Sequence, residues 1–261
     1  MKKPSIFNST FGSITYIVHV WLDVENTILG VSRQPFMKHV RSPAWSKLRM
    51  ALFERYTLRS LLNQSFGDFQ ILLFLNPKYR RIHEQFELEA NVARIYDDGK
   101  SFYTKELDSD YAVIFRTDSD DLLHKDCMQL IKDTADFRNF RTSRTFHKVI
   151  QWNIYHKFIS DFRLSRSPFT AHVFPRRIYS DWNRIKVEQF MDYKSCPVHF
   201  EDRKICIIRH GANVTFPRIG KNMRSEKYLR DEIQKRNNFI VDRSKMQKTL
   251  KDYGIPAELV K

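Results

Sequence analysis

The chain has 261 residues, of which 42% are hydrophobic, and it carries a net charge of +15. This length is enough to bury one sizeable core, and the absence of low-complexity runs and of repeats at a fixed period argues against solenoids, linkers and disordered arms. The three cysteines are odd in number and have no CxxC spacing, which indicates neither a disulfide framework nor a cysteine zinc site and fits a reducing compartment.

The longest apolar stretch near the N-terminus, Ile14 to Leu22, is interrupted by His19. It is far shorter than the roughly 20 residues that span a bilayer. Lys2 and Lys3 followed by so short an apolar run make a poor secretory signal. We therefore expect a cytoplasmic protein.

The positive charge is concentrated in the second half of the chain. Residues 1–133 are almost neutral, whereas residues 134–186 contain 11 Lys or Arg against 3 Asp or Glu, and residues 218–261 contain 12 against 6. Such a surface favours a polyanion, a phosphorylated substrate or an anionic membrane face, and charge alone does not choose among them.

Predicted strands and helices alternate in the first half. Runs rich in β-branched, aromatic and aliphatic residues predict strands at 14–22, 69–75, 92–96 and 111–115. The pattern predicts helices at 44–64, around Tyr103 and from the residue after Asp121 through Ile131, with a weakly amphipathic segment at 79–91. This βαβαβαβα order predicts a mostly parallel sheet flanked by helices, whose strand ends are where such folds bind ligands.

The pattern changes after residue 133. Short aromatic and β-branched pieces at 148–159 and 170–174, and an apolar strand at 203–209, predict mixed β structure, and residues 225–253 look helical and charged. We expect one α/β domain over 10–217, with halves at about 10–133 and 134–217, and a basic helical tail over 218–261.

The acidic cluster Asp118-Ser119-Asp120-Asp121 directly follows the fourth strand. Three carboxylates within four positions repel one another unless a cation neutralises them, and Mg²⁺ or Mn²⁺ prefers carboxylate and phosphate oxygens. A metal that bridges these carboxylates to a nucleotide diphosphate explains the arrangement, and the ion would stabilise charge on a departing diphosphate. The alternative is an acidic turn that caps the following helix.

Three blocks of sequence resemble the putative rhamnosyltransferase family of bacterial GT-A-like enzymes. They are the helix from Trp45 to Ser65 followed by Asp68-Phe69, the segment Phe115-Arg-Thr-Asp-Ser-Asp-Asp-Leu122, and His210-Gly211-x-Asn213. The resemblance implies a GT-A-like fold in which residues 10–133 bind the donor and residues 134–217 bind the acceptor. One departure is that Val20-Trp21-Leu22 stands where the family usually has an arginine.

The resemblance also implies the metal ligands. Asp118 and Asp120 would be the DxD pair, with Asp120 as the direct ligand, and Asp121 would be a further ligand or a catalytic partner of the pair. His210 would complete the set, with a structural histidine as the alternative. Gly211, which lets the backbone approach the phosphates, and Asn213 of the same block would bind the donor.

Five further residues are expected to bind the nucleotide diphosphate sugar. Asp97 and Asp98 end the third strand and would contact the base or ribose, unless they only form an Asp-Asp-Gly turn. Arg49 and Arg55 would pair with the diphosphate, unless they lie on a solvated helix face. Arg116 directly precedes the cluster and would neutralise it or hold one carboxylate in place.

An inverting transfer needs a carboxylate that deprotonates the acceptor hydroxyl. Glu188, Asp192, Glu201 and Asp202 lie between the DxD pair and His210, where GT-A enzymes commonly place this base. We select Glu188. Whether the transfer inverts or retains the anomeric configuration is not readable from the sequence.

The sequence therefore predicts a metal-dependent glycosyltransferase that uses Mn²⁺ or Mg²⁺. It would move a hexose or deoxyhexose, with rhamnose implied by the resemblance, from a nucleotide diphosphate sugar to a glycan or lipid-linked acceptor. The basic tail would contact the inner membrane face, or would be a docked helix with a solvated basic face.

The alternative from another class is a metal-dependent nucleic-acid enzyme or a basic nucleic-acid-binding protein. Its support is basic charge interleaved with aromatic residues that resemble a stacking surface, namely Trp152, Tyr155, Phe158, Phe162 and Phe169. No helix-turn-helix, zinc-finger or RNA-binding signature is present, so a nucleic-acid partner is not expected. The sequence does not identify the nucleotide, the sugar, the acceptor, the linkage or the oligomeric state.

Overall fold

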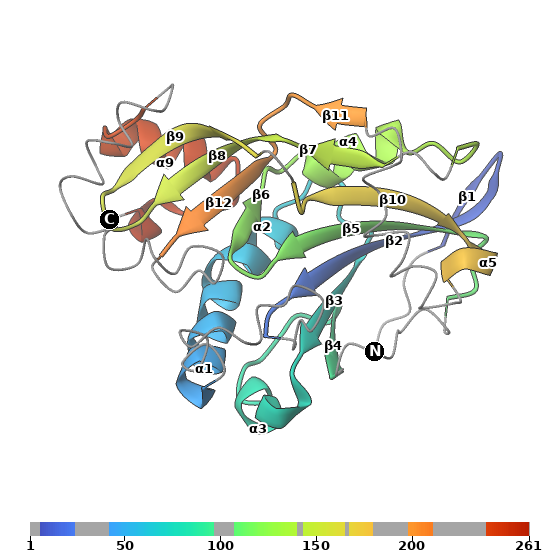
Figure 1. Ribbon diagram of the computed structural model, residues 1–261, viewed down its shortest axis with the longest axis horizontal. Helices are drawn as coiled ribbons and strands as arrows, with labels where there is room; N and C mark the ends of the chain where they lie inside the picture. The colour runs from blue at the N-terminus through green and yellow to red at the C-terminus, as the bar shows by residue number, and fades with distance from the viewer. Residues whose placement is uncertain are drawn as a thin grey trace.

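A computed structural model describes residues 6–23, 42–96, 107–139, 143–164, 167–179, 198–210 and 239–260. These residues form a mixed α/β structure with two sheets and several helices (Figure 1). In these ranges, no helix is long and apolar enough to cross a membrane.

The larger sheet has eight strands in the order β11-β7-β10-β5-β2-β3-β4, with β1 paired to β2. Its strands are β1 (Phe7–Ser9), β2 (Gly12–Trp21), β3 (Gln70–Leu75), β4 (Val92–Tyr96), β5 (Tyr111–Asp118), β7 (Arg144–Phe146), β10 (Thr170–Pro175) and β11 (Val198–Phe200). The neighbours β4, β3, β2 and β5 are parallel, whereas β10 pairs antiparallel with β5. The predicted parallel arrangement is therefore present from β5 to the edge strand β4, and β10 extends the sheet in the antiparallel direction on the other side of β5.

The smaller sheet has the order β6-β12-β8-β9 and lies beside the β5 and β10 side of the larger sheet (Figure 1). Its strands are β6 (Asp121–Leu123), β8 (Lys148–Asn153), β9 (Phe158–Arg163) and β12 (Ile205–Arg209). The mixed β structure predicted after residue 133 is confirmed. The helix predicted to begin directly after the acidic cluster is wrong at its start, because Asp121 begins a strand that pairs antiparallel with β12.

The helices of the first half overlap the segments predicted to be helical. Over the whole described chain, the helices and helical turns are α1 (Pro43–Leu52), the π-helical segment η4 (Phe53–Leu58), α2 (Arg59–Leu62), the 3-10 turn η5 (Pro77–Tyr79), α3 (Arg80–His83), α4 (Cys127–Thr134), α5 (Arg176–Tyr179), α9 (Arg243–Lys251) and the 3-10 turn η8 (Ala257–Leu259). Ser42 caps α1 by accepting a hydrogen bond from the Trp45 backbone N–H, and Pro43 occupies the first turn, where its missing N–H costs nothing. The helix predicted around Tyr103 lies outside the described residues.

Alternation along β2 explains why the larger sheet is covered on both faces. Tyr16, Val18 and Val20 face a core that includes Met50 of α1 and Phe53 of η4. Ile17 faces the core on the opposite side of the sheet. A third core lies between the smaller sheet and the C-terminal segment. It contains Tyr56, Leu122, Ile150, Trp152, Ile159, Cys206, Ile208, Met246, Leu250, Tyr253, Ile255 and Val260.

The described part of the predicted tail is thus docked onto the protein. Met246 and Leu250 of α9 are buried, while Lys245 and Lys248 on the same helix are exposed. The Tyr253 hydroxyl donates to the Arg203 carbonyl at 2.5 Å, and the Lys125 backbone N–H donates to the Asp252 carbonyl at 2.7 Å. Over residues 239–260, a docked segment with a solvated basic face is the correct description; the rest of the tail lies outside the described residues.

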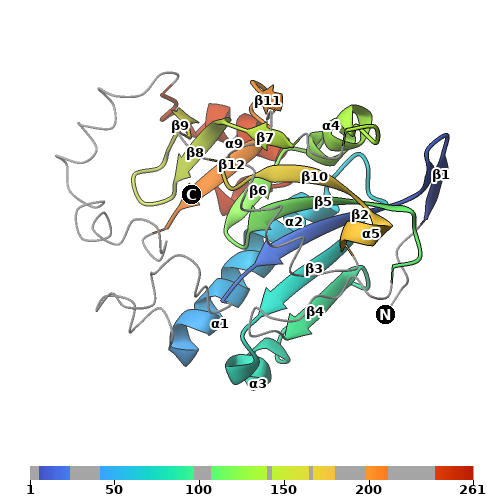
Figure 2. The same cartoon turned by 45° about the vertical axis from the view of Figure 1, so that its right-hand side comes forward.

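Strand order identifies the edge of the sheet at which a ligand is expected to bind. In chain order, β2, β3 and β4 extend outward in one direction, and β5 then returns to pair with β2 on its other side. Figure 2 shows these four strands pointing toward the same edge, where α1 and α3 lie. Open α/β sheets bind ligands outside the carboxyl ends of the strands where the order reverses. That position is the end of β2 and β5.

Candidate functional site

The acidic cluster lies at this reversal point, where the chain passes from the larger sheet to the smaller one. Asp118 is the last residue of β5 and pairs in register with Trp21 of β2, and Asp121 is the first residue of β6. The Ser119 backbone N–H donates to the Trp21 carbonyl at 3.3 Å. The helix-cap interpretation of the cluster is therefore wrong, because the next helix begins only at Cys127.

Asp120 is the central residue of the site and is buried. Arg49, from α1, donates from both terminal nitrogens to the two oxygens of Asp120, and its Nη2 also donates to Ser119 Oγ at 2.5 Å. His210, directly after β12, places Nε2 at 2.8 Å from Asp120 Oδ2. Burial opposes the charge, but Arg49 and His210 outweigh it and hold the pKa of Asp120 well below its usual range. Asp120 is thus an ionised carboxylate held by side chains from two separate segments, α1 and the end of β12.

The other two carboxylates have different surroundings. The Asp118 side chain is 38% exposed and lies 3.9 Å from the Arg116 guanidinium, which stacks over the Trp21 ring at 5.2 Å. Asp121 is buried, and burial together with the charges of Asp120 and Asp118 raises the pKa of Asp121 well above its usual range. The cluster therefore combines one accessible carboxylate, Asp118, with two buried carboxylates whose pKa values are shifted in opposite directions.

Arg49 and Arg55, which lie on the helix predicted over residues 44–64, have different surroundings in the structure. Arg49 is 5% exposed and binds the protein's own Asp120 and Ser119, so the solvated-face alternative is wrong for this residue. Arg55 is exposed and stacks over the Tyr56 ring at 5.5 Å. For Arg55 the solvated-face alternative holds.

The remaining predicted residues are only partly placed by the structure. Glu201 and Asp202 are exposed, and Glu201 lies 3.4 Å from Arg163. Outside the described residues lie Asp97, Asp98, Glu188, Asp192, Gly211 and Asn213. Their roles stay predictions.

A second buried polar cluster, which the sequence did not indicate, lies at the end of β2. Ser46 Oγ donates to Asp23 Oδ2 at 2.5 Å, and His83 Nε2 lies 2.9 Å from the same Asp23 oxygen and 2.8 Å from Ser46 Oγ. In a hydrolytic triad the acid and the serine contact different nitrogens of the histidine. Here one nitrogen contacts both, and the Asp23 and His83 side chains are fully buried, so the cluster ties elements together rather than attacking a substrate.

The site offers few ligands for a divalent cation. Within the described ranges, no group of three or more His, Cys, Asp or Glu side chains is arranged to hold a metal. The 2.8 Å between Asp120 Oδ2 and His210 Nε2 is a hydrogen-bond distance, and both Asp120 oxygens also accept from Arg49. Mg²⁺ typically takes one or two carboxylates, several waters and substrate phosphates, and the accessible carboxylate of this cluster is Asp118.

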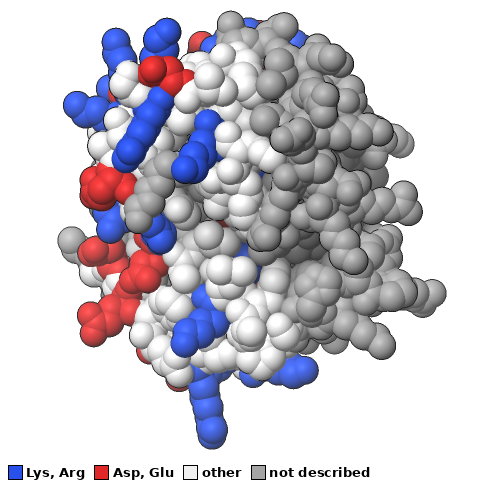
Figure 3. Space-filling view, turned by 90° about the vertical axis from the view of Figure 1, so that its left-hand side faces the viewer, with Lys and Arg blue, Asp and Glu red and all other residues white. Residues whose placement is uncertain are grey.

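The aromatic side chains behind the nucleic-acid alternative are largely buried. Trp152, Phe158 and Phe169 are buried, and Tyr155 is 37% exposed. On the face in Figure 3, described Lys and Arg side chains lie among Asp and Glu side chains, many of which gather along one edge. The aromatic residues therefore do not form the stacking surface that the sequence suggested.

Comparisons with known proteins add little to this geometry. No protein-family model matches the chain, and no curated protein matches it by sequence. Among solved structures, the chain is similar to residues 1–349 of TarS from S. aureus, with a TM-score of 0.31 and 12% identity, over 76% of this chain and 61% of that one. So weak a likeness establishes no shared fold, and the resemblance to rhamnosyltransferases stays a prediction.

Proposed function

We propose that the protein is a glycosyltransferase with a GT-A-like fold, which transfers a hexose or deoxyhexose from a nucleotide diphosphate sugar to a glycan or lipid-linked acceptor. The supporting observation is that Asp120 is held ionised by Arg49 and His210 at the carboxyl ends of β2 and β5. This is where an open α/β sheet binds a nucleotide.

In this proposal, Asp118, Asp120 and His210 would hold a Mn²⁺ or Mg²⁺ ion, and Asp118 is the most accessible of the three side chains. The ion, when bound, stabilises the negative charge that develops on the departing diphosphate. Arg49 keeps the Asp120 carboxylate charged and fixes both of its oxygens. Arg116, stacked on Trp21, limits the movement of the Asp118 carboxylate.

The finer assignments belong to the proposal as well. Asp97 and Asp98 would bind the base or ribose, Gly211 and Asn213 the phosphates, and Glu188 would deprotonate the acceptor hydroxyl. Rhamnose is the sugar that the family resemblance implies, and the acceptor would be reached at the inner membrane face.

The test is a calorimetric titration of UDP, dTDP and GDP with and without Mn²⁺. Asp118→Ala is the informative variant, because this side chain is 38% exposed and its replacement leaves the buried pair of Arg49 and Asp120 intact. Asp68→Ala is the matched control, since Asp68 is an exposed carboxylate just before β3, at the opposite edge of the sheet.

We expect one nucleotide to bind wild-type protein and the Asp68→Ala variant only when Mn²⁺ is present, and to bind the Asp118→Ala variant at least tenfold more weakly. If none of the three nucleotides binds with or without Mn²⁺, the transferase proposal is wrong. Equal loss in both variants would show that the cluster is not the nucleotide site.

A further inference from the structure

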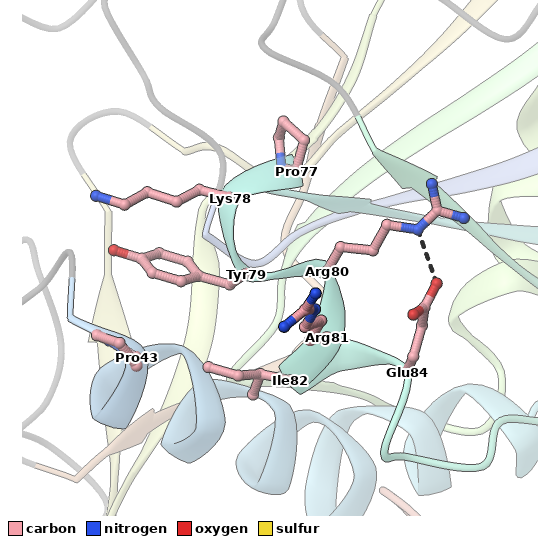
Figure 4. A pocket seen from close by; sticks show the side chains of 8 residues that line it. All are labelled: Pro43, Pro77, Lys78, Tyr79, Arg80, Arg81, Ile82 and Glu84. Atoms are coloured by element: carbon pink, nitrogen blue, oxygen red, sulfur yellow. Dashed lines mark hydrogen bonds and ion pairs between the residues drawn. The ribbon is translucent and has the colours of Figure 1, made fainter.

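A cavity of about 590 Å³ lies apart from the acidic cluster, between the start of α1 and the segment that follows β3 (Figure 4). This volume is in the range of small-molecule sites. Its lining residues are Pro43, Pro77, Lys78, Tyr79, Arg80, Arg81, Ile82 and Glu84. None of the carboxylates of the DxDD cluster belongs to this lining.

The lining carries an excess of positive charge. Arg80 Nε donates to Glu84 Oε1 at 2.7 Å, which neutralises the only carboxylate among the eight residues. Lys78 lies over the Tyr79 ring at 5.7 Å, and within the described ranges neither Lys78 nor Arg81 forms an ion pair. Two cations on one small cavity favour an anionic ligand.

The two walls of the cavity are fixed to each other by the buried cluster at the end of β2. Asp23 Oδ1 accepts from the Asn76 backbone N–H at 2.7 Å, which holds the start of η5, and Asp23 Oδ2 accepts from Ser46 of α1. His83, at the end of α3, closes the same cluster. The backbone segments that carry the lining residues are therefore anchored to each other.

The cavity and the acidic cluster are joined by one helix. Pro43 lines the cavity and Arg49, six residues later on α1, binds Asp120. A rise of 1.5 Å per residue separates these positions by about 9 Å along the helix axis. A ligand at the cavity thus lies close to, but outside, the Asp120 site.

We propose that this cavity binds a phosphate group, with Lys78 and Arg81 as its cationic contacts. The proposal rests on the cavity's own residues and goes beyond the transferase assignment. The phosphate could be carried by the nucleotide or by a second, phosphorylated substrate, and both sources present the same chemistry to the two cations.

The experiment is a calorimetric titration of the full chain with inorganic phosphate, pyrophosphate and UDP plus Mn²⁺ at about 0.15 M ionic strength, where long-range attraction is screened. The test variant is Lys78→Gln/Arg81→Gln, which changes two exposed side chains without burying a charge. The charge-matched control is Lys245→Gln/Lys248→Gln on the exposed face of α9. Asp118→Ala is included to report on the acidic cluster.

We expect inorganic phosphate to bind wild-type protein, the α9 control and Asp118→Ala equally, and to bind the Lys78→Gln/Arg81→Gln variant about tenfold more weakly or not at all. A parallel loss of UDP binding in that variant would assign the phosphate to the nucleotide, and unchanged UDP binding would assign it to a second substrate.

Three results would overturn the cavity proposal. One is that phosphate does not bind wild-type protein, and another is that the α9 control weakens phosphate binding as much as the cavity variant does. Pyrophosphate binding that is lost only in Asp118→Ala would also refute the cavity site, while leaving the transferase proposal in place.

Discussion

Replacing Arg49 tests whether the site depends on a buried ion pair. Arg49 is 5% exposed and Asp120 is 6% exposed, and the two share two hydrogen bonds. Arg49→Met fills much of the same volume and leaves Asp120 paired with His210. Removing one member of a buried pair costs about 3–5 kcal/mol, and because His210 remains, we expect a loss of about 3 kcal/mol in the free energy of unfolding.

Urea unfolding followed by circular dichroism measures this loss. With a slope of about 3 kcal/mol per molar urea, the midpoint should fall by about 1 M. Arg55→Met is the control, because Arg55 lies on the same helix but is exposed, and its replacement should change stability by less than about 0.5 kcal/mol. In Arg49→Met/Asp120→Asn, which leaves no unpaired charge, part of the loss should be recovered.

The reasoning is refuted if Arg49→Met and Arg55→Met unfold at the same urea concentration. It is also refuted if the stability loss of Arg49→Met/Asp120→Asn equals the sum of the losses measured for Arg49→Met alone and Asp120→Asn alone. Additive losses would mean that Arg49 and Asp120 are not coupled.

Two further predictions concern stability. Burial lowers the pKa of His19 to about 3, with a further contribution from Arg116, and lowers that of His172 to about 4. The unfolded chain binds these protons below about pH 6.5 and the folded chain does not, so stability should fall by about 2 kcal/mol for each histidine between pH 8 and pH 5. Urea unfolding at both pH values measures this, and a His19→Gln/His172→Gln variant that kept the full pH dependence would contradict it. Gly254 has φ +72°, and an added Cβ would lie 2.9 Å from the Asn63 side chain. We therefore expect Gly254→Ala to lower the melting temperature by costing about 1–3 kcal/mol. Gly67→Ala, where the nearest contact is 4.0 Å away, should be close to neutral, and equal effects would mean that the docked C-terminal segment does not depend on this turn.

The local features of the fold were predictable from the sequence. The apolar runs at 14–22, 69–75 and 111–115 became β2, β3 and β5, because a parallel strand that is covered on both faces needs apolar residues at nearly every position. The same alternation of strands and helices placed Asp118 at a carboxyl end of the sheet, as the structure shows.

The errors and omissions involve pairing between distant residues. Asp121 to Leu123 is too short to predict as a strand, and its pairing partner, Ile205 to Ile207, lies more than 80 residues away. The cluster of Asp23, Ser46 and His83 likewise joins three separate segments, and no spacing in the sequence indicates it.

Helix geometry limits the choice between the two arginines but does not make it. At 3.6 residues per turn, Arg49 and Arg55 would lie about 120° apart around the axis, so only one of them is expected to face the acidic cluster. Ser46 and Arg49 are three residues apart and share a face. The burial of Ser46, which only the structure shows, identifies Arg49 as the inward residue.

This shared face gives α1 a specific role in the site. Ser46 fixes the helix to Asp23 at the end of β2, and one turn later Arg49 fixes it to Asp120 beyond the end of β5. Because the order of the sheet reverses between these two strands, α1 lies across the position at which an open α/β sheet is expected to bind a ligand. A shift of the helix along its axis would break both contacts at once. The distance from the end of β2 to the Asp120 carboxylate is therefore set by the three-residue spacing of Ser46 and Arg49 on α1.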